Sequence, residues 1–333
     1  MNKYIVNFSM KKDSTITIGV VGVGHLGNFH LIQLKQIHGV TISGIYDNDK
    51  IRLNEMSKKH NVNNFRSVTE LFNVSDAVII VTPTITHYSI ASEALQFGRH
   101  VFIEKPITNT INQAESLIEK GKKLNKIIQV GHIERFNPAF NKLTSMNINP
   151  QFIESHRLSQ FNSRSIDIPV ILDLMIHDLD IILSMINSDI INIQANGVKV
   201  VSSSIDIANA RIEFANGCIA NLSASRISQK DLRKMRLFQT NEYITLDFKN
   251  QILEHYLVKN NASDCNTNNV IIELGNNKKY IQFDLPQVER YDALRKELEH
   301  FVHCIKNNKK PITDVISATK ALELAIQIQD IIN

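Results

Sequence analysis

The chain has 333 residues, which is enough for two domains of ordinary size. Its 43% of hydrophobic and 21% of charged residues are close to the globular average, so disordered and fibrous classes are excluded. Thirty-seven basic and 33 acidic residues give a net charge of +4, without the concentrated basic face of a nucleic-acid binder. The longest apolar stretch, residues 170–191, is interrupted by four aspartates and a histidine, so no membrane span is predicted.

Cysteine usage and the start of the chain indicate the compartment. The three cysteines, Cys218, Cys265 and Cys304, are odd in number and widely spaced, which supports neither a disulfide framework nor a zinc cluster. The first 14 residues lack the uncharged apolar core of a signal peptide. We therefore expect a cytoplasmic protein with no membrane partner, no nucleic-acid partner and no metal site.

The first 130 residues alternate between short apolar runs and helical patterns. Residues 15–21 form a β-branched apolar run, which is typical of a strand buried on both faces. Further strands are predicted at residues 40–46, 77–81, 100–103 and 127–130, and helices at 26–37, 49–60, 89–97 and 111–124. Such alternation predicts an α/β fold with a doubly wound parallel sheet, the Rossmann arrangement.

The pattern changes after Gly131, where strand-like segments follow one another with few helices between them. They lie at residues 152–158, 190–201, 208–214, 218–225, 235–239, 243–248, 270–274 and 280–283. This favours a large, mostly antiparallel sheet. Helices are predicted at residues 171–185, 288–305 and 315–332, and an exposed loop at 260–269. We therefore expect two domains, residues 1–133 and 134–333, with the last helix able to pack back on the first domain.

A glycine-rich turn follows the first predicted strand. Its residues, Gly22, Val23, Gly24, His25, Leu26 and Gly27, form the pattern G-x-G-x-x-G. The first glycine permits a tight turn, the second lets a pyrophosphate approach the backbone, and the third lets the helix pack on the strand. The alternative is a purely structural glycine turn.

An acidic residue completes this dinucleotide pattern. Asp47 lies twenty residues after Gly27, at the end of the second predicted strand. Its carboxylate can accept hydrogen bonds from both ribose hydroxyls and would repel a 2′-phosphate. The pattern therefore predicts NAD as cofactor and disfavours NADP.

Two further segments follow parallel strands at the edge where ligands of such sheets bind. Thr82 and Pro83 follow the third strand, and His87 begins the next helix, either as a cap residue or as a cofactor contact. Glu104 and Lys105 end the fourth strand. Lys105 can hold a substrate hydroxyl and help to remove its proton; the alternative is a surface lysine held by the proline that follows.

Asp173 and His177 are four residues apart in a predicted helix, so both side chains lie on one face. Asp180 can lie above His177 on that face. A carboxylate beside an imidazole orients a general base and stabilises its protonated form. A capping or buried polar role is the alternative, and a metal site would need a third ligand that the sequence does not indicate.

Together these motifs resemble the glucose–fructose oxidoreductase, inositol dehydrogenase and rhizopine catabolism (Gfo/Idh/MocA) family. The resemblance implies a Rossmann domain followed by an α/β domain whose open sheet forms homodimer or homotetramer contacts. It implies that Lys105, Asp173 and His177 form the catalytic group around the nicotinamide and the substrate carbon. The cofactor contacts it implies include Thr82, Pro83, His87, Glu104 and Lys105.

Residues 131–138 and 173–180 are similar to the sugar-nucleotide branch of that family, the UDP-N-acetylglucosamine 3-dehydrogenases. This similarity implies oxidation at C3 of a UDP-N-acetylhexosamine, which would suit a following aminotransferase in lipopolysaccharide synthesis. Met175 stands where many relatives carry glycine. The alternatives are a dehydrogenase of a free polyol or monosaccharide and a non-catalytic NAD-sensing regulator.

Four polar residues are candidates for substrate contacts. Arg135, between the two predicted domains, can hold the carboxamide side of the cofactor or the substrate, or form an ion pair. Arg157, Asn162 and Arg164 precede the helix of Asp173 and are candidates for diphosphate or sugar contacts; the alternative is that they are solvated loop residues.

Overall fold

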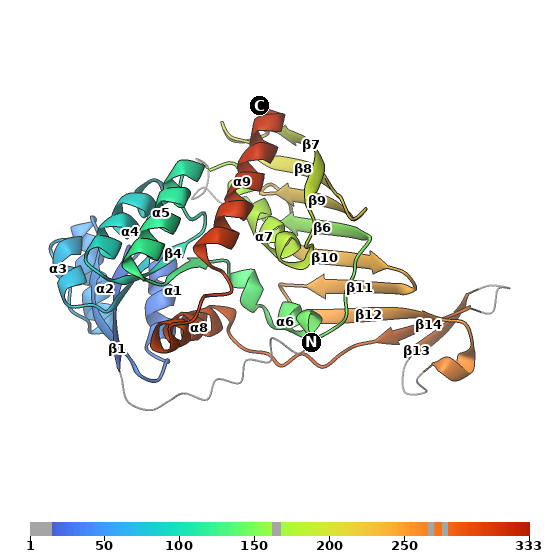
Figure 1. Cartoon of the computed structure of the whole chain (residues 1–333), viewed down its shortest axis with the longest axis horizontal. Coiled ribbons are helices and arrows are strands. Elements are labelled where there is room, and N and C mark those ends of the chain that lie inside the picture. The colour runs from blue at the N-terminus through green and yellow to red at the C-terminus, as the bar shows by residue number, and fades with distance from the viewer. Residues whose placement is uncertain (1–14, 162–167, 266–269, 275–278) are drawn as a thin grey trace. The chain divides into compact units, whose positions relative to one another are not determined.

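The computed structural model describes residues 15–161, 168–265, 270–274 and 279–333, which form two compact units (Figure 1). The parallel-sheet unit contains the described residues up to 136 together with residues 292–323. The large-sheet unit contains the described residues of 137–291 together with residues 324–333. Each unit is built around its own sheet.

The sheet of the parallel-sheet unit has the order β2-β1-β3-β4-β5, and all of its pairings are parallel. Its strands are β1 (Ile16–Val21), β2 (Val40–Tyr46), β3 (Ala77–Ile80), β4 (His100–Glu104) and β5 (Ile128–Gly131). All four residues of β3 are buried, as expected for a strand covered on both faces. The predicted doubly wound sheet is therefore confirmed.

The helices of this unit connect its strands, except for the last helix, which follows the large-sheet segment of the chain. They are α1 (His25–Leu34), α2 (Lys50–His60), α3 (Val68–Asn73), α4 (His87–Gln96), α5 (Ile111–Leu124) and α8 (Ala293–Asn307), with 3₁₀ turns η1 (Thr84–Thr86) and η2 (Ile133–Phe136). Helix α3 was not predicted, because its six residues are too few to show a helical period. Ser67, a residue type that is common at the start of helices, is the N-cap of α3. Its hydroxyl accepts a hydrogen bond from the N–H of Glu70.

Helix α8 corrects two predictions. It begins at Ala293 and not at residue 288, because the carboxylate of Asp292 caps it by accepting from the N–H of Arg295. It also belongs to the parallel-sheet unit, where the Phe301 ring packs 5.8 Å from the ring of Phe102. The boundary at residues 133/134 therefore assigned α8 to the wrong domain, because its buried apolar face completes the core of the first sheet.

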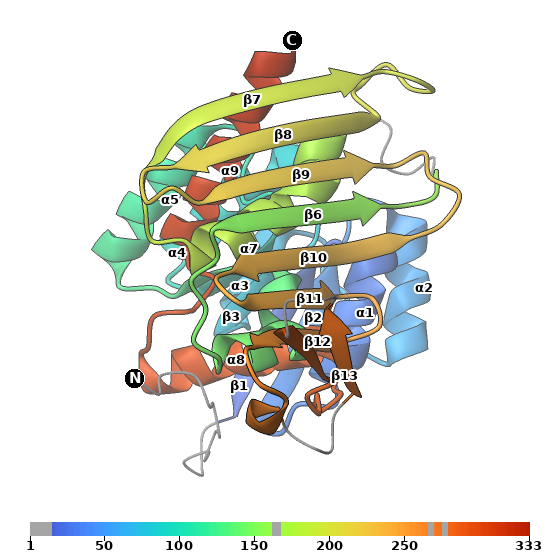
Figure 2. The same cartoon turned by 90° about the vertical axis from the view of Figure 1, so that its right-hand side faces the viewer.

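The second sheet has the order β13-β14-β12-β11-β10-β6-β9-β8-β7 in the described residues (Figure 2). Its strands are β6 (Phe152–Leu158), β7 (Ile190–Val198), β8 (Ile207–Phe214), β9 (Ile219–Ser225), β10 (Leu232–Gln239), β11 (Glu242–Asp247), β12 (Ile252–Lys259), β13 (Val270–Leu274) and β14 (Lys279–Asp284). All pairings are antiparallel except that of β6 with β9, so the predicted sheet type is confirmed. Strand β12 was not predicted.

The helical elements that remain are α6 (Pro138–Thr144), η4 (Ile171–Met175), α7 (Ile176–Met185), η5 (Ala262–Asp264) and α9 (Val315–Ile332). The prediction of one regular α-helix over residues 171–185 is wrong for its first turn, because η4 is π-helical. Such turns need an extra residue per turn and are frequent at functional sites. None of the helices in the described ranges is long and apolar enough to cross a membrane.

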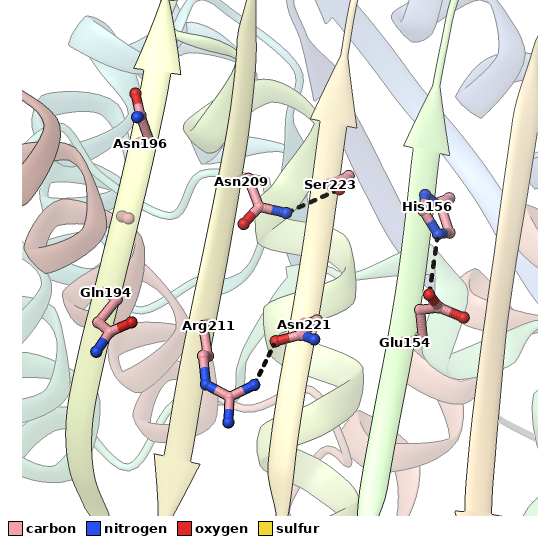
Figure 3. A pocket seen from close by; sticks show the side chains of 9 residues that line it. Glu154, His156, Gln194, Asn196, Asn209, Arg211, Asn221 and Ser223 are labelled. Carbon is pink, nitrogen blue, oxygen red and sulfur yellow. Dashed lines mark hydrogen bonds and ion pairs between the residues drawn. The ribbon is translucent and has the colours of Figure 1, made fainter.

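Burial alternates along strands such as β6, which shows that one face of the large sheet is buried and the other is partly exposed. Over β6, β10, β11, β12 and β14 this face carries a row of aromatic rings with centroids 4.7–5.7 Å apart: Phe152, Phe238, Tyr243, Tyr256 and Phe283. Toward β7 it is polar, with a hollow lined by Glu154, His156, Gln194, Asn196, Asn209, Arg211, Asn221 and Ser223 (Figure 3). The expected homo-oligomer contact through this sheet stays a prediction.

The buried His300 on α8 makes the stability of the parallel-sheet unit depend on pH. Its Nδ1 lies 3.0 Å from Oε1 of Gln129, and burial, with the charges of His303 and Lys296, lowers its pKa from 6.5 to about 4. Between these values the unfolded chain binds a proton that the folded chain does not. Stability is therefore lost as the pH falls from 6.5 toward 4, by at most about 3 kcal/mol.

We expect His300→Gln to reduce this loss, measured as the free energy of unfolding in urea at several pH values across that window. His38→Gln, at an exposed histidine, is the matched control for the substitution itself. The same pH dependence in the His300→Gln protein as in the wild type would contradict the assignment.

Candidate active site

Three glycines shape the turn between β1 and α1, and each meets a different constraint. Gly22 has a φ of +88°, and a β-carbon there would lie 2.6 Å from the carbonyl oxygen of Val81. A β-carbon on Gly27 would lie 2.1 Å from the carbonyl oxygen of Gly22. One on Gly24 would meet nothing within 4 Å. Gly22 and Gly27 are therefore required by the protein backbone, whereas Gly24 leaves open space above the turn.

The start of α1 has the properties of an anion site. Its N-cap is Gly24, which offers no side chain to the free N–H groups of the first turn. His25 and Leu26 form that turn, and Leu26 is exposed. The turn lies beside the carboxyl ends of β1 and β3. From β1 the chain continues to β2 on one side of the sheet, whereas β3 lies on the other side, and ligands of such sheets bind at this switch in strand order. Uncapped N–H groups, a helix dipole and open space over Gly24 fit a dinucleotide pyrophosphate.

The carboxylate of Asp47 joins this turn to the second strand. Asp47 is only 7% exposed, and its Oδ2 accepts from the N–H of Val23 at 2.8 Å. Its Oδ1 accepts from the N–H of Asp49 at 2.9 Å. Each carboxylate oxygen can accept a second hydrogen bond, so the pair of oxygens can still receive ribose hydroxyls. Arg52 lies 3.7 Å from Oδ1 of Asp47 and 3.2 Å from Asp49.

His87 connects the loops that follow β3 and β4. It is 1% exposed, with Nε2 2.8 Å from the carbonyl oxygen of Thr82 and Nδ1 2.8 Å from that of Pro106. Burial lowers the pKa of this imidazole despite those carbonyls. Of the two roles that the sequence left open, the cap role is wrong, because Thr86 is the N-cap of α4 and no side chain caps it. The cofactor contact of His87 stays a prediction. Pro83 precedes η1, and the Thr86 hydroxyl donates to that of Thr82, which closes the first of the two loops.

Glu104 and Lys105 lie at the same carboxyl edge of the sheet. Oε1 of Glu104 lies 2.8 Å from Nε2 of His30, and its Oε2 accepts from the N–H of Lys105 at 3.2 Å. Burial alone would raise the pKa of Glu104, but the hydrogen bond and charge of His30, with the charge of Lys105, lower it. The carboxylate is therefore ionised beside Lys105. His30 was not among the predicted site residues. The sequence did place this histidine on the same face of the predicted helix as Gly27 and Leu34, the face that is buried.

Asp173 and His177 both belong to the large-sheet unit, the first in the π-helical turn η4 and the second in the first turn of α7. The turn begins two residues after Pro169, whose carbonyl oxygen accepts from the N–H of Asp173. Asp180 is buried one turn after His177. Met175 is fully buried at the end of the π-helical turn, so its side chain packs into the core of this unit.

Arg157 is not a solvated loop residue, which was the alternative to the predicted diphosphate or sugar contact. It lies on β6, is 3% exposed, and binds Asp178 through two hydrogen bonds, Nε to Oδ2 at 3.0 Å and Nη2 to Oδ1 at 2.7 Å. Its guanidinium also stacks over the ring of Phe248. Because both partners are buried, this pair anchors α7 to the sheet, and a substrate contact of Arg157 stays a prediction.

The other three candidate substrate residues have different outcomes. Arg135 lies in η2, where its Nη2 donates to the carbonyl oxygen of Ile312 at 3.4 Å. Asn162 and Arg164 lie outside the described residues. Their roles stay predictions.

Two family patterns match this chain. The pattern described as "Oxidoreductase family, NAD-binding Rossmann fold" covers residues 16–132, and the "GFO/IDH/MocA C-terminal domain" covers residues 146–245. The UDP-N-acetylglucosamine 3-dehydrogenase of Acidithiobacillus ferrooxidans is 34% identical over 312 residues, 93% of this chain and 95% of the relative. The scyllo-inositol 2-dehydrogenase (NAD(+)) of Bacillus subtilis is 26% identical over 334 residues, 93% of this chain and 92% of the relative.

A solved structure of the Acidithiobacillus ferrooxidans enzyme superposes with a TM-score of 0.86 at 33% identity, covering 95% of this chain and 97% of that one. Fold, glycine turn and matched patterns together define an NAD-binding oxidoreductase. The chain belongs to the Gfo/Idh/MocA family, and it is a dehydrogenase that acts on CH–OH groups.

The glycine geometry predicts opposite effects for two alanine substitutions. Gly24→Ala should fold normally, because its β-carbon meets no protein atom, but should weaken NADH binding by about tenfold or more, because the methyl group occupies the space of the pyrophosphate. Gly27→Ala should lower the melting temperature, because its β-carbon overlaps the carbonyl of Gly22. NADH fluorescence titration and thermal unfolding measure the two effects. Unchanged NADH affinity in Gly24→Ala would refute the assignment of the turn.

Proposed function

We propose that this dehydrogenase oxidises a ring secondary hydroxyl of a sugar, at C3 of a UDP-N-acetylhexosamine, with NAD as cofactor. The observation that carries the proposal is the similarity to the UDP-N-acetylglucosamine 3-dehydrogenase, which extends over 93% of the chain. The presence of Lys105, Asp173 and His177 in a chain of this family supports turnover and argues against a non-catalytic regulator.

Three side chains have roles in the proposed reaction. His177 takes the proton of the substrate hydroxyl, and Asp173 orients its imidazole. Lys105 donates a hydrogen bond to the same oxygen and stabilises the charge that develops as the carbonyl forms. The glycine turn of Gly22–Gly27 and Asp47 would hold the NAD, which would supply the acceptor for the hydride from the substrate carbon.

The product of this reaction is a 3-keto sugar, which is a substrate for transamination. An aminotransferase would therefore follow this enzyme in the cytoplasm, in a sequence that leads to lipopolysaccharide. A free polyol is the second candidate substrate, since the relative from Bacillus subtilis is named for scyllo-inositol.

A substrate panel separates these candidates. We expect UDP-N-acetylglucosamine to support NAD reduction and scyllo- and myo-inositol to support little, followed by NADH absorbance, with the ketone position determined after trapping as an oxime. Lys105→Ala and His177→Ala should each lower kcat by about 10²- to 10⁴-fold while NADH still binds. Lys123→Ala, at an exposed helical lysine, is the control. Normal turnover in both site variants would refute their roles.

The cofactor preference is proposed from Asp47, whose carboxylate would face a ribose hydroxyl and repel a 2′-phosphate. Asp47→Asn should weaken NAD binding while it improves binding of NADP relative to NAD. Binding constants for both cofactors, measured by calorimetry in the wild type and the variant, give the ratio. Equal losses for NAD and NADP would contradict the ribose assignment.

A further inference from the structure

A part-buried hydrogen bond connects the first helix of the parallel-sheet unit to the strand that ends immediately before Lys105. His30, on α1, is 1% exposed, and its Nε2 lies 2.8 Å from Oε1 of Glu104, the last residue of β4. Helix α1 begins at the glycine turn, and β4 continues directly into Lys105. The bond therefore spans two elements that the proposed function uses for different tasks, one for the cofactor and one for the substrate.

The carboxylate of Glu104 is held on three sides. Its Oε2 accepts from the N–H of Lys105 at 3.2 Å, opposite the bond to His30. Its third neighbour is Gly131, the register partner of Glu104 on β5, where an added β-carbon would lie 2.8 Å from Oε2. Because the side chain has so little room, a shift of the carboxylate shifts the peptide group of Lys105 with it.

The orientation of His30 is also restricted. An ionised carboxylate only accepts hydrogen bonds, so Nε2 of His30 donates the one to Glu104. The His30 ring packs edge-on against Phe102 with centroids 5.5 Å apart. Its Nδ1 is buried and has no hydrogen-bond partner among the described residues. Among the described residues, the His30 ring therefore forms its hydrogen bond with Glu104.

We propose that His30 and Glu104 are positioning residues for Lys105: the hydrogen bond from α1 fixes the carboxylate, and the carboxylate fixes the peptide group from which the Lys105 side chain extends. The proposal rests on the role of Lys105 in the proposed function. Neither side chain needs to touch the substrate. Loss of the bond lets the Lys105 amine adopt a wider range of directions, so it affects the chemical step more than the binding of either ligand.

The kinetic test uses His30→Gln, Glu104→Gln, the double variant and the control His60→Gln. His60 is a suitable control because it is also buried and also bonds to α1, through Asn28 at 2.9 Å, but does not bond to Glu104. We expect kcat to fall about 10- to 100-fold in both single variants, with substrate KM and NADH affinity within about threefold of the wild type. The double variant should be no slower than the slower single variant, because both changes break one interaction. His60→Gln should retain kcat.

A second readout does not depend on which sugar is turned over. Lysines are dimethylated with ¹³C-formaldehyde, and the resonance of Lys105 is assigned by its absence in Lys105→Arg. We expect this resonance to shift in His30→Gln and Glu104→Gln and to stay in place in His60→Gln. An unmoved resonance in both site variants overturns the proposal, as do additive losses of kcat in the double variant. If no sugar in the panel is oxidised, the proposed function fails, and the Lys105 resonance alone still decides whether the pair positions the lysine.

Discussion

The close approach of α1 to the end of β1 is the constraint on which the cofactor side of this protein depends. Because Gly27 has no side chain, the helix backbone comes within reach of the carbonyl of Gly22, where a β-carbon would be 2.1 Å away. That approach brings the uncapped first turn of α1 to the carboxyl edge of the sheet. It also brings His30, one turn later, against the end of β4. The proposed pyrophosphate site and the hydrogen bond proposed to position Lys105 therefore both depend on this one packing contact.

The large-sheet unit has a comparable anchor. The buried bidentate pair of Arg157 and Asp178 connects β6 to α7, and removal of one partner of such a pair typically costs about 3–5 kcal/mol. Asp178 follows His177 directly in the chain, so adjacent residues of one helix have separate tasks. Asp178 holds the helix on the sheet, and His177 is the residue proposed to take the substrate proton. The π-helical turn places Asp173 immediately before this anchored segment.

Much of the fold could be predicted because local patterns were sufficient for it. The strands of the parallel sheet were visible as apolar runs, and α5 and α9 have the predicted bounds. The predictions were wrong or incomplete where a side-chain cap sets the start of a helix, or where the partner of a residue lies far away in the sequence. Asp292 starts α8 later than its apolar period suggests. Arg157 was a candidate substrate contact with a solvated loop residue as the alternative, and its bond to the buried Asp178 was not predicted. His30 was missed because its partner, Glu104, lies 74 residues away in the sequence.

By itself the sequence determined the sheet types, the glycine turn, its acidic partner and the residues proposed for catalysis, because each depends on residue types at short spacing. Only the tertiary structure decided that α8 completes the first core, that His87 joins two loops, and that Glu104 is held from α1 and β5. Those results depend on contacts between segments far apart in the chain. Such contacts form only when packing brings the segments together, so no local pattern encodes them.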